Sequence, residues 1–277
     1  MKKATRGFTL IEISFFLALT GALFVAIIVG TQNSLWQQKY NDSVTNFTNF
    51  LRTTYSQVSN PQGISEGRSD RAIYGRLIVF GENYDLKSER IPQGEQKIFV
   101  YDIVGDAQSV GTGSIKDILA TLNLNVLEEE VENGAVVDVY PAGFTDSYSP
   151  TWNAVIERPF YTEGEDNNFK GSIMIVKHPR SGVINTLYSS RTIQVNETVR
   201  NARLAGNFES TKTLLSSKLD TFDIVGNSDD GDIDMCLNPY GMGHTGSFRR
   251  DIRIVKNSRS SVGVVIVDQD DPTSKCN

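Results

Sequence analysis

The sequence predicts an α+β protein, in which one long N-terminal helix precedes a β-rich region. Three observations favour this class: residues 8–30 are almost uniformly apolar, residues 36–58 repeat apolar side chains at helical spacing, and short apolar or alternating runs follow from residue 65 onward. The chain has 277 residues, of which 39% are hydrophobic and 22% are charged, so it can bury a sizeable core. Its formal net charge of −6 argues against nonspecific binding of nucleic acid over the whole surface.

The N-terminal segment predicts a membrane-spanning helix. Residues 1–7 are polar and basic, and residues 8–30 carry a single charged side chain, Glu12. As a helix, residues 8–30 would be about 34 Å long, enough to cross the hydrocarbon core of a bilayer. The positive-inside rule keeps Lys2, Lys3 and Arg6 in the cytoplasm. We therefore expect a single-pass membrane protein whose remaining chain lies on the extracytoplasmic side.

Two ordinary explanations of this segment are weaker. A secretory signal peptide has a shorter apolar core followed by a cleavage site between small residues, and the sequence after Val29 matches such a site poorly. A simple membrane anchor fits the length but leaves Glu12 unexplained, because an unpaired charge within an apolar span costs roughly 2.5–3.5 kcal/mol. Glu12 therefore predicts a partner for its carboxylate.

The residues around Glu12 form a recognisable motif. Gly7 ends the basic segment, Phe8 follows it, and Glu12 is the fifth residue after Gly7. This arrangement closely resembles the processing motif of type IV prepilins. The resemblance implies a leader peptide over residues 1–7, cleavage between Gly7 and Phe8 by a prepilin peptidase, and N-methylation of Phe8. It also implies that residues 8–30 enter the core of a filament, with other pilin subunits and a membrane assembly platform as partners.

Glu12 has an expected role in that assembly. Cleavage would create a new α-amino group at Phe8, and Glu12 of one subunit would pair with Phe8 of a neighbour inside a bundle of apolar helices. A buried ion pair adds little net stability, but it penalises wrong registers strongly. We therefore expect Glu12 to set the axial stagger of the subunits. The alternative is a carboxylate that is merely tolerated near the membrane interface.

Residues 31–60 predict an amphipathic continuation of the same helix. Apolar side chains recur at spacings of three and four residues along one face, at Trp36, Tyr40, Val44, Phe47, Leu51, Tyr55 and Val58. The first proline is Pro61, so one helix is expected from residue 8 to residue 59. The fold of type IV pilins, which the N-terminus resembles, is a lollipop in which the C-terminal half of such a helix packs on an antiparallel β-sheet head.

Residues 61–277 predict that β-rich head. Candidate strands lie at residues 72–80, 98–104, 135–140, 153–157, 172–177, 183–188, 233–237, 250–255 and 262–267. Residues 178–182 are expected to join two of them as a hairpin, and residues 257–261 the last two. Short helices are expected at residues 115–124 and 209–219.

The two cysteines, Cys236 and Cys276, predict a disulfide if the head is exported. In a reducing compartment they would instead be two buried thiols. Closing the loop would stabilise the head by roughly 3–4 kcal/mol on the chain-entropy model. The region 236–276 also resembles the disulfide-closed C-terminal region of type IV pilins, which pins the end of the sheet and forms surface that faces partners.

An acidic run near the first cysteine offers candidate metal ligands. Asp230, Asp232 and Asp234 alternate along the chain and could present oxygen atoms to Ca²⁺. The run lacks the downstream glutamate of an EF-hand loop, since Gly241 stands at that position. We therefore favour a solvated acidic turn and expect no cofactor.

A basic run inside the same region offers candidate partner-binding residues. Arg249, Arg253 and Lys256 are the leading positions, and DNA, a host surface or an acidic neighbour are candidate partners. No aromatic side chains are interleaved to stack nucleic-acid bases. The favoured alternative is a solvated strand edge, part of which turns toward the core, because Arg250 shares a face with Ile252 and Ile254.

Catalysis is not expected. The histidines, His178 and His244, are far apart in the sequence, and no nucleophilic triad, phosphate-binding loop or zinc-ligand spacing accompanies them. The leading expectation is a structural subunit of a type IV pilus, a minor pilin because the head is large. The alternatives are a pseudopilin of a type II secretion or DNA-uptake machine, which shares the N-terminal motif, and a tip adhesin or DNA-binding minor pilin.

Overall fold

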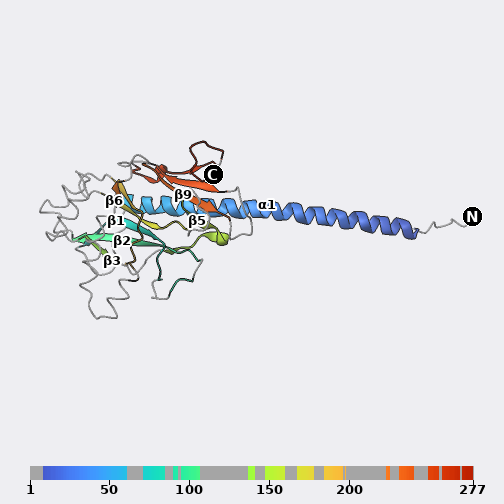
Figure 1. Ribbon diagram of the computed structural model, residues 1–277, viewed down its shortest axis with the longest axis horizontal. Coiled ribbons are helices and arrows are strands. Elements are labelled where there is room, and N and C mark those ends of the chain that lie inside the picture. The colour runs from blue at the N-terminus through green and yellow to red at the C-terminus, as the bar shows by residue number, and fades with distance from the viewer. Residues whose placement is uncertain are drawn as a thin grey trace, which may run out of the picture. The chain divides into compact units, whose positions relative to one another are not determined.

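The computed structural model divides into two compact units, Met1–Asp42 and Ser43–Asn277. The residues that it describes are 9–60, 71–84, 90–92, 95–106, 137–140, 147–159, 167–177, 184–195, 197, 223–224, 231–239, 249–255, 258–268 and 270–276 (Figure 1). Within these ranges, the backbone alone is described for residues 33, 71–74, 102–106, 137–140, 153 and 223–224.

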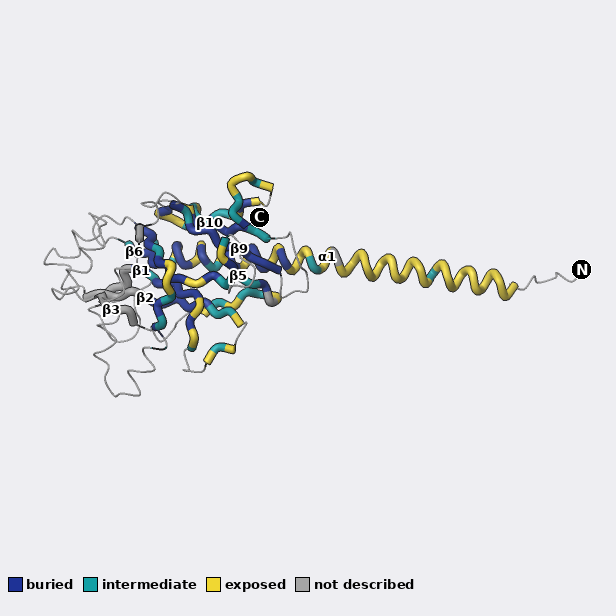
Figure 2. The backbone as a smooth tube through the Cα atoms, in the orientation of Figure 1, coloured by how far each residue is buried: buried dark blue, intermediate teal, exposed yellow. Residues whose placement is uncertain are grey.

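Helix α1 (Leu10–Ser59) confirms the expected single helix, and its first part makes up the described portion of the first unit. The large apolar side chains between Leu10 and Leu35 are exposed, and the tube in Figure 2 is almost wholly yellow along this stretch. Its hydroxyl groups bond back to the helix itself, since Ser14, Thr20 and Thr31 each donate at 2.9 Å to the carbonyl oxygen four residues earlier. α1 is therefore long and apolar enough to cross a membrane.

From Ser43 onward, α1 belongs to the second unit and its apolar stripe is buried. Phe47, Leu51 and Tyr55 have no exposed surface, and Val44 and Val58 are nearly as buried. At the C-terminal end of the helix, the carbonyl oxygen of Ser59 accepts a hydrogen bond from the Lys177 ammonium group at 2.6 Å. This half of the helix is the centre of the head's core, as the amphipathic pattern predicted.

The first sheet contains β1 (Arg71–Phe80), β2 (Ile98–Asp106), β3 (Val137–Tyr140), β4 (Ser147–Tyr148), β6 (Gly171–Lys177), β7 (Ile184–Ser189) and β8 (Asp223–Ile224). Its order is β3-β2-β1-β6-β7-β8, with β4 also paired to β2, and every pair is antiparallel. The β1–β2 register shifts between Ile73 and Gly75. Gly75 is needed there, because a Cβ atom would lie 2.3 Å from the Ile175 carbonyl oxygen.

The second sheet contains β5 (Val155–Glu157), β9 (Ile233–Asn238), β10 (Arg250–Ile254) and β11 (Val264–Val267). Its order is β11-β10-β9-β5, again with antiparallel pairs throughout. Two short 3-10 helices, Thr151–Asn153 and Ser261–Gly263, precede β5 and β11.

Helix α1 contacts both sheets. The Tyr55 hydroxyl group lies 2.7 Å from the hydroxyl oxygen of Thr186 on β7, whereas the Arg52 guanidinium group donates at 2.9 and 3.1 Å to the Val264 carbonyl oxygen on β11. Figure 1 accordingly shows α1 between strands of the two sheets. A layered arrangement of this kind lets the helix bury apolar side chains on more than one side.

Each predicted strand overlaps a described strand, but residues 153 and 262–263, which were expected in strands, lie in 3-10 helices. β4 and β8 were not predicted, since strands of two residues carry no periodic signal. The antiparallel β6–β7 pair confirms the predicted hairpin partners, although residues 178–183 lie outside the described residues. The two short helices predicted at residues 115–124 and 209–219 also lie outside them. One expectation needs correction: the head contains two sheets where one was expected.

Candidate functional site

Two regions contain the residues that the sequence singled out: the start of α1 and the outer face of the second sheet. At the start of α1, Gly7 and Phe8 lie outside the described residues, and Thr9 and Glu12 lie within them. Glu12 is surrounded by exposed apolar side chains, among them Ile11 and Phe15. The predicted processing and assembly roles of these positions stay predictions.

Thr9 and Glu12 form a capping box. The Glu12 Oε2 atom accepts hydrogen bonds from the Thr9 backbone N–H and hydroxyl group, both at 2.8 Å, and the Glu12 N–H donates to the Thr9 hydroxyl oxygen at 3.3 Å. This role of Thr9 was not predicted from the sequence. The signal was present, because a threonine three residues before a glutamate at the head of an apolar run is the pattern of a capping box. Thr9 therefore fixes where the Glu12 carboxylate lies.

The outer face of the second sheet is closed by the end of the chain. A disulfide joins Cys236 on β9 to Cys276, with 5.4 Å between their Cα atoms, so the predicted pairing is confirmed. We call residues 270–276 the C-terminal tail. Strand alternation turns Met235, Ile252 and Ile254 to the opposite face, where they are buried.

Five charged side chains lie beneath and within this tail: Asp232, Asp234, Asp251, Arg253 and Lys275. We call them the charge cluster. The Arg253 guanidinium group donates to Asp234 and, at 3.1 Å, to Asp251, and lies 3.8 Å from Asp232. Lys275 contributes its ammonium group, 3.1 Å from Asp234, and its backbone N–H, which donates to Asp251 at 3.2 Å.

The side chains of Asp251 and Asp234 are almost fully buried, with 0% and 2% of their surfaces exposed. Burial, together with the nearby charge of Asp234, raises the pKa of Asp251 to about 6. The Oδ1 atom of Asp251 is buried without a hydrogen-bond partner. The cluster therefore has an excess of negative charge that its two cations do not fully balance.

Both expectations for the charged runs need correction. Asp234 is a buried strand residue paired with cations, so the solvated acidic turn is wrong for it; Asp230 lies outside the described residues. The solvated strand edge is also wrong, because β10 is a central strand. Among the described residues, no group of three or more His, Cys, Asp or Glu side chains is arranged to hold a metal ion.

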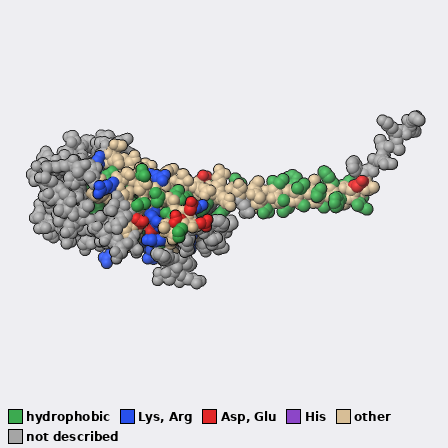
Figure 3. All heavy atoms as spheres, turned by 90° about the horizontal axis from the view of Figure 1, so that it is seen from above, with side chains coloured by type: hydrophobic (Ala, Val, Ile, Leu, Met, Phe, Trp, Pro, Cys, Tyr) green, Lys and Arg blue, Asp and Glu red, His purple; other side chains and the backbone are tan. Residues whose placement is uncertain are grey.

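The candidate partner-binding arginines have partners within the chain. Arg253 belongs to the charge cluster, and Arg249 lies 3.6 Å from the buried carboxylate of Glu157 on β5. Arg250, on the other face of β10, pairs with the exposed Asp268 at 2.5 Å. Lys256 lies outside the described residues. Figure 3 accordingly shows acidic and basic side chains next to one another on the head.

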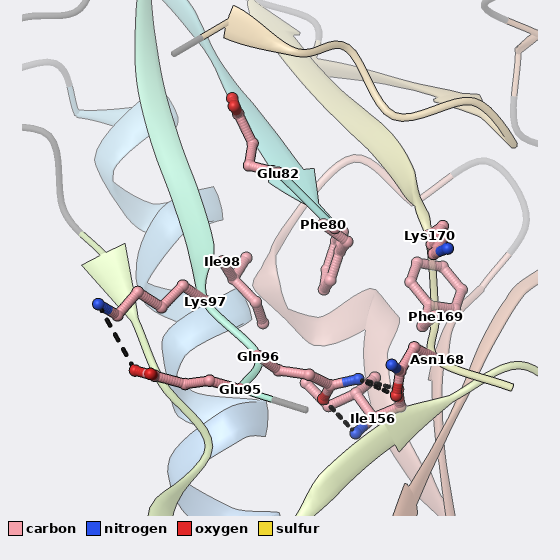
Figure 4. Close-up of a pocket in the computed structure, with 11 residues that line it drawn as sticks. Phe80, Glu82, Glu95, Gln96, Lys97, Ile98, Ile156, Asn168, Phe169 and Lys170 are labelled. Atoms are coloured by element: carbon pink, nitrogen blue, oxygen red, sulfur yellow. Dashed lines mark hydrogen bonds and ion pairs between the residues drawn. The ribbon is translucent and has the colours of Figure 1, made fainter. Parts of the chain in front are cut away.

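A small cavity of about 60 Å³ lies where the two sheets approach each other (Figure 4). The Gln96 side chain crosses this gap, donating to the Ile156 carbonyl oxygen at 2.8 Å and accepting from the Ile156 N–H at 2.7 Å. Phe80 and Phe169 meet edge to face, with 4.9 Å between ring centroids. Sites for small molecules usually occupy about 300–1,000 Å³. The cavity is therefore too small for such a ligand, and its Gln96 side chain links the two sheets.

No family model matches the chain, and neither a curated protein nor a solved structure was found to match it.

Proposed function

We propose that this chain is a structural subunit of a type IV pilus-like filament, a minor pilin that a prepilin peptidase processes and that assembles through its N-terminal helix. The observation that carries the proposal is the combination of Gly7, Phe8 and Glu12 at their spacing with the apolar surface that begins there. Before assembly the chain would be a single-pass membrane protein with its head outside the cytoplasmic membrane. After assembly it would belong to a filament at the cell surface.

The apolar surface of α1 supports both states. Large apolar side chains from Leu10 to Leu35 are exposed, and Figure 3 shows apolar side chains as green spheres along the face of the helix in view. A helix that is apolar all round is stable only within lipid or among other apolar helices. Lipid would cover this surface before assembly, and the helices of neighbouring subunits would cover it afterwards.

The capping box gives Glu12 a defined position for contact with a neighbour. Both hydrogen bonds that Thr9 donates to the carboxylate go to Oε2. The Glu12 Oε1 atom can then accept a hydrogen bond from the Phe8 amine of a neighbouring subunit, while Oε2 keeps its hydrogen bonds from Thr9. A carboxylate held in this way needs less reordering when the partner arrives, so the pairing can select one axial register at a small entropic cost.

The buried half of α1 couples the axial position of the N-terminal helix to the position of the head. Phe47, Leu51 and Tyr55 fill the head's core, and Arg52 also ties the helix to the second sheet. Packing of this density leaves the helix little freedom to slide. A shift of the N-terminal helix by one register would therefore displace the head with it.

Glu12→Ala is the decisive variant. We expect it to abolish incorporation into filaments, because the Phe8 amine of the neighbour would lose its counter-ion in an apolar bundle. Incorporation is measured by immunoblotting of sheared filaments, and the total amount of subunit in the membrane fraction is measured alongside it. The disulfide should still form, since it lies in the other unit.

Two controls separate the charge from the helix cap. Thr9→Val removes the capping hydroxyl group and keeps the carboxylate, so it should reduce incorporation less than Glu12→Ala. Ser14→Ala changes a hydroxyl group that bonds only within the helix and should leave incorporation intact. Normal filament entry by Glu12→Ala would refute the assembly mechanism. Peptide mapping that finds Gly7 still joined to Phe8 in the mature chain would refute the assignment to this class.

The contacts of the arginines in and next to β10 argue against a DNA-binding role for this strand. Arg249 and Arg253 both pair with carboxylates of the same chain, and Arg253 is only 11% exposed. Contacts to nucleic-acid phosphates need cations that can leave their protein partners at little cost. A pseudopilin of a secretion or DNA-uptake machine would share the N-terminal helix, so the outcome of Glu12→Ala applies to it as well.

A further inference from the structure

The C-terminal tail is held on the outer face of the second sheet by two independent kinds of link. One is covalent, between Cys236 and Cys276. The other is a set of polar contacts with β9 and β10. In this set Arg253 donates at 2.5 Å to the Thr273 carbonyl oxygen, and the Lys275 N–H and ammonium group reach Asp251 and Asp234. The contacts lie directly before Cys276 in the chain.

Charge favours the docking of this tail. On the sheet itself, three carboxylates of the charge cluster face one guanidinium group, that of Arg253. Lys275, which belongs to the tail, contributes the second cation. Burial, and after it the nearby charge of Asp234, raises the pKa of Asp251, and the Oδ1 atom of Asp251 has no hydrogen-bond partner. The sheet face is thus complementary to a tail that carries a lysine at this position.

The tail is also shaped locally for this contact. The Asp271 Oδ1 atom accepts hydrogen bonds from the Thr273 N–H at 2.8 Å and from its hydroxyl group at 2.7 Å. The Ser274 N–H in turn donates to the Asp271 carbonyl oxygen at 2.9 Å. Such turns form between near neighbours in the chain and need no tertiary partner. In the folded chain the Thr273 carbonyl oxygen accepts a hydrogen bond from Arg253.

We propose that the charge cluster docks the C-terminal tail before the disulfide forms, and thereby positions Cys276 against Cys236 for oxidation. Asp251 is the cross-strand partner of Cys236, and Lys275 immediately precedes Cys276, so the docking contacts flank both sulfur atoms. Lys275, Arg253, Asp234 and Asp251 act as positioning residues in this scheme. The inference goes beyond the proposed function and does not depend on filament assembly.

The oxidation step needs an external disulfide, such as oxidised glutathione or a protein disulfide of the exported compartment. The Cys276 thiol loses its proton, and the thiolate attacks one sulfur of that disulfide, forming a mixed disulfide and releasing one thiolate. The Cys236 thiolate then attacks the Cys276 sulfur, which forms the Cys236–Cys276 bond and releases the second thiolate. Two electrons pass to the external disulfide, which leaves as two thiols. Docking accelerates the second attack, because it brings the two sulfur atoms together.

The first test measures the effective concentration of the two thiols from their equilibrium with glutathione, on the full-length chain in detergent micelles. Lys275→Gln should lower the effective concentration about tenfold, the factor expected from losing one charge-assisted contact. Arg250→Gln is the matched control, because Arg250 lies on β10 with Arg253 but pairs with Asp268, and within the described part of the chain it forms no hydrogen bond or ion pair with a tail residue. Arg250→Gln should change the effective concentration of the two thiols by less than about twofold.

The second test asks whether the tail stays docked without the disulfide. In the Cys236→Ser/Cys276→Ser variant, hydrogen exchange should still protect the Lys275 N–H, which bonds to Asp251. Adding Lys275→Gln to this variant should remove the protection. Equal effective concentrations in Lys275→Gln and the original chain would overturn the proposal. So would free exchange of the tail whenever the disulfide is absent.

Discussion

At the scale of single residues, Asp251 and Arg253 show how the neighbours of a charged side chain decide its role. The two lie on the same face of β10 and pair with each other, and both also contact the C-terminal tail. Asp251 is fully buried, with Asp234 nearby, so its ionised form is disfavoured relative to water. A carboxylate in this position costs stability at neutral pH and gives the sheet face its negative charge.

The raised pKa of Asp251 predicts a specific pH dependence. Its pKa is about 6 in the folded chain and 3.8 ordinarily, so between about pH 4 and pH 6 the folded state keeps a proton that the unfolded state has lost. The contribution of Asp251 to the free energy of unfolding therefore falls as pH rises through this window. Asp251→Asn has no such dependence. Relative to the original chain, its free energy of unfolding should rise by roughly 2–3 kcal/mol between pH 4 and pH 7.

Urea unfolding of the full-length chain in detergent at several pH values measures this difference. Asp268→Asn is the matched control, because Asp268 is 82% exposed and directly follows β11. Its effect should stay within about 0.5 kcal/mol across the same pH range. A flat difference between Asp251→Asn and the original chain would show that Asp251 does not hold its proton in the folded state.

At the scale of elements, α1 contains two segments with different surroundings in one unbroken helix. Around Leu10–Leu35 the apolar side chains are exposed on all sides, whereas from Val44 onward they form one buried stripe. No proline interrupts the helix, and the hydroxyl groups of the first segment bond to its own carbonyl groups. The second segment is held by core packing.

Leu51→Ala should destabilise the head strongly. Leu51 has no exposed surface, so truncation would remove apolar contacts and leave a cavity that costs about 2–5 kcal/mol. Thr53→Ala, two residues away on the exposed face, should change the free energy of unfolding by less than about 0.5 kcal/mol. Both values come from urea unfolding at neutral pH with the disulfide intact. Equal effects of the two substitutions would mean that the buried stripe is not part of the core.

At the scale of the whole molecule, the core of the head depends on a helix that begins outside it. The second unit starts at Ser43, and α1 contacts both sheets through Arg52 and Tyr55. The sheets also meet directly, through the Gln96 side chain and the backbone of Ile156. We therefore expect the head, including the second half of α1, to unfold as one cooperative structure.

Truncation tests this unity. A chain of residues 31–277 should be soluble without detergent, form its disulfide and unfold cooperatively, because it loses the exposed apolar run and keeps the buried stripe. A chain of residues 53–277 should fail to fold, because it lacks Val44, Phe47 and Leu51. Size-exclusion chromatography and thermal unfolding followed by circular dichroism distinguish the two. Cooperative unfolding of both at the same temperature would place α1 outside the core.

Much of the fold was predictable because its signals are local. The apolar run and the stripe of α1 are periodic over many residues, and the longer strands are apolar or alternating runs bounded by turns. The signal of the Thr9–Glu12 capping box is equally local, because the two residues are three positions apart. The Cys236–Cys276 bond followed from an even cysteine count, conditional on export.

Local patterns in the sequence predicted the long helix, its apolar and amphipathic segments and nine of the strands, and they contain the N-terminal motif on which the proposed function rests. Only the folded chain shows that the strands form two sheets and that charged side chains near the cysteines pair with one another. The physical reason is distance along the chain. Arg253 finds its partners at Asp234 and Thr273, on segments that only strand pairing and tail docking bring together.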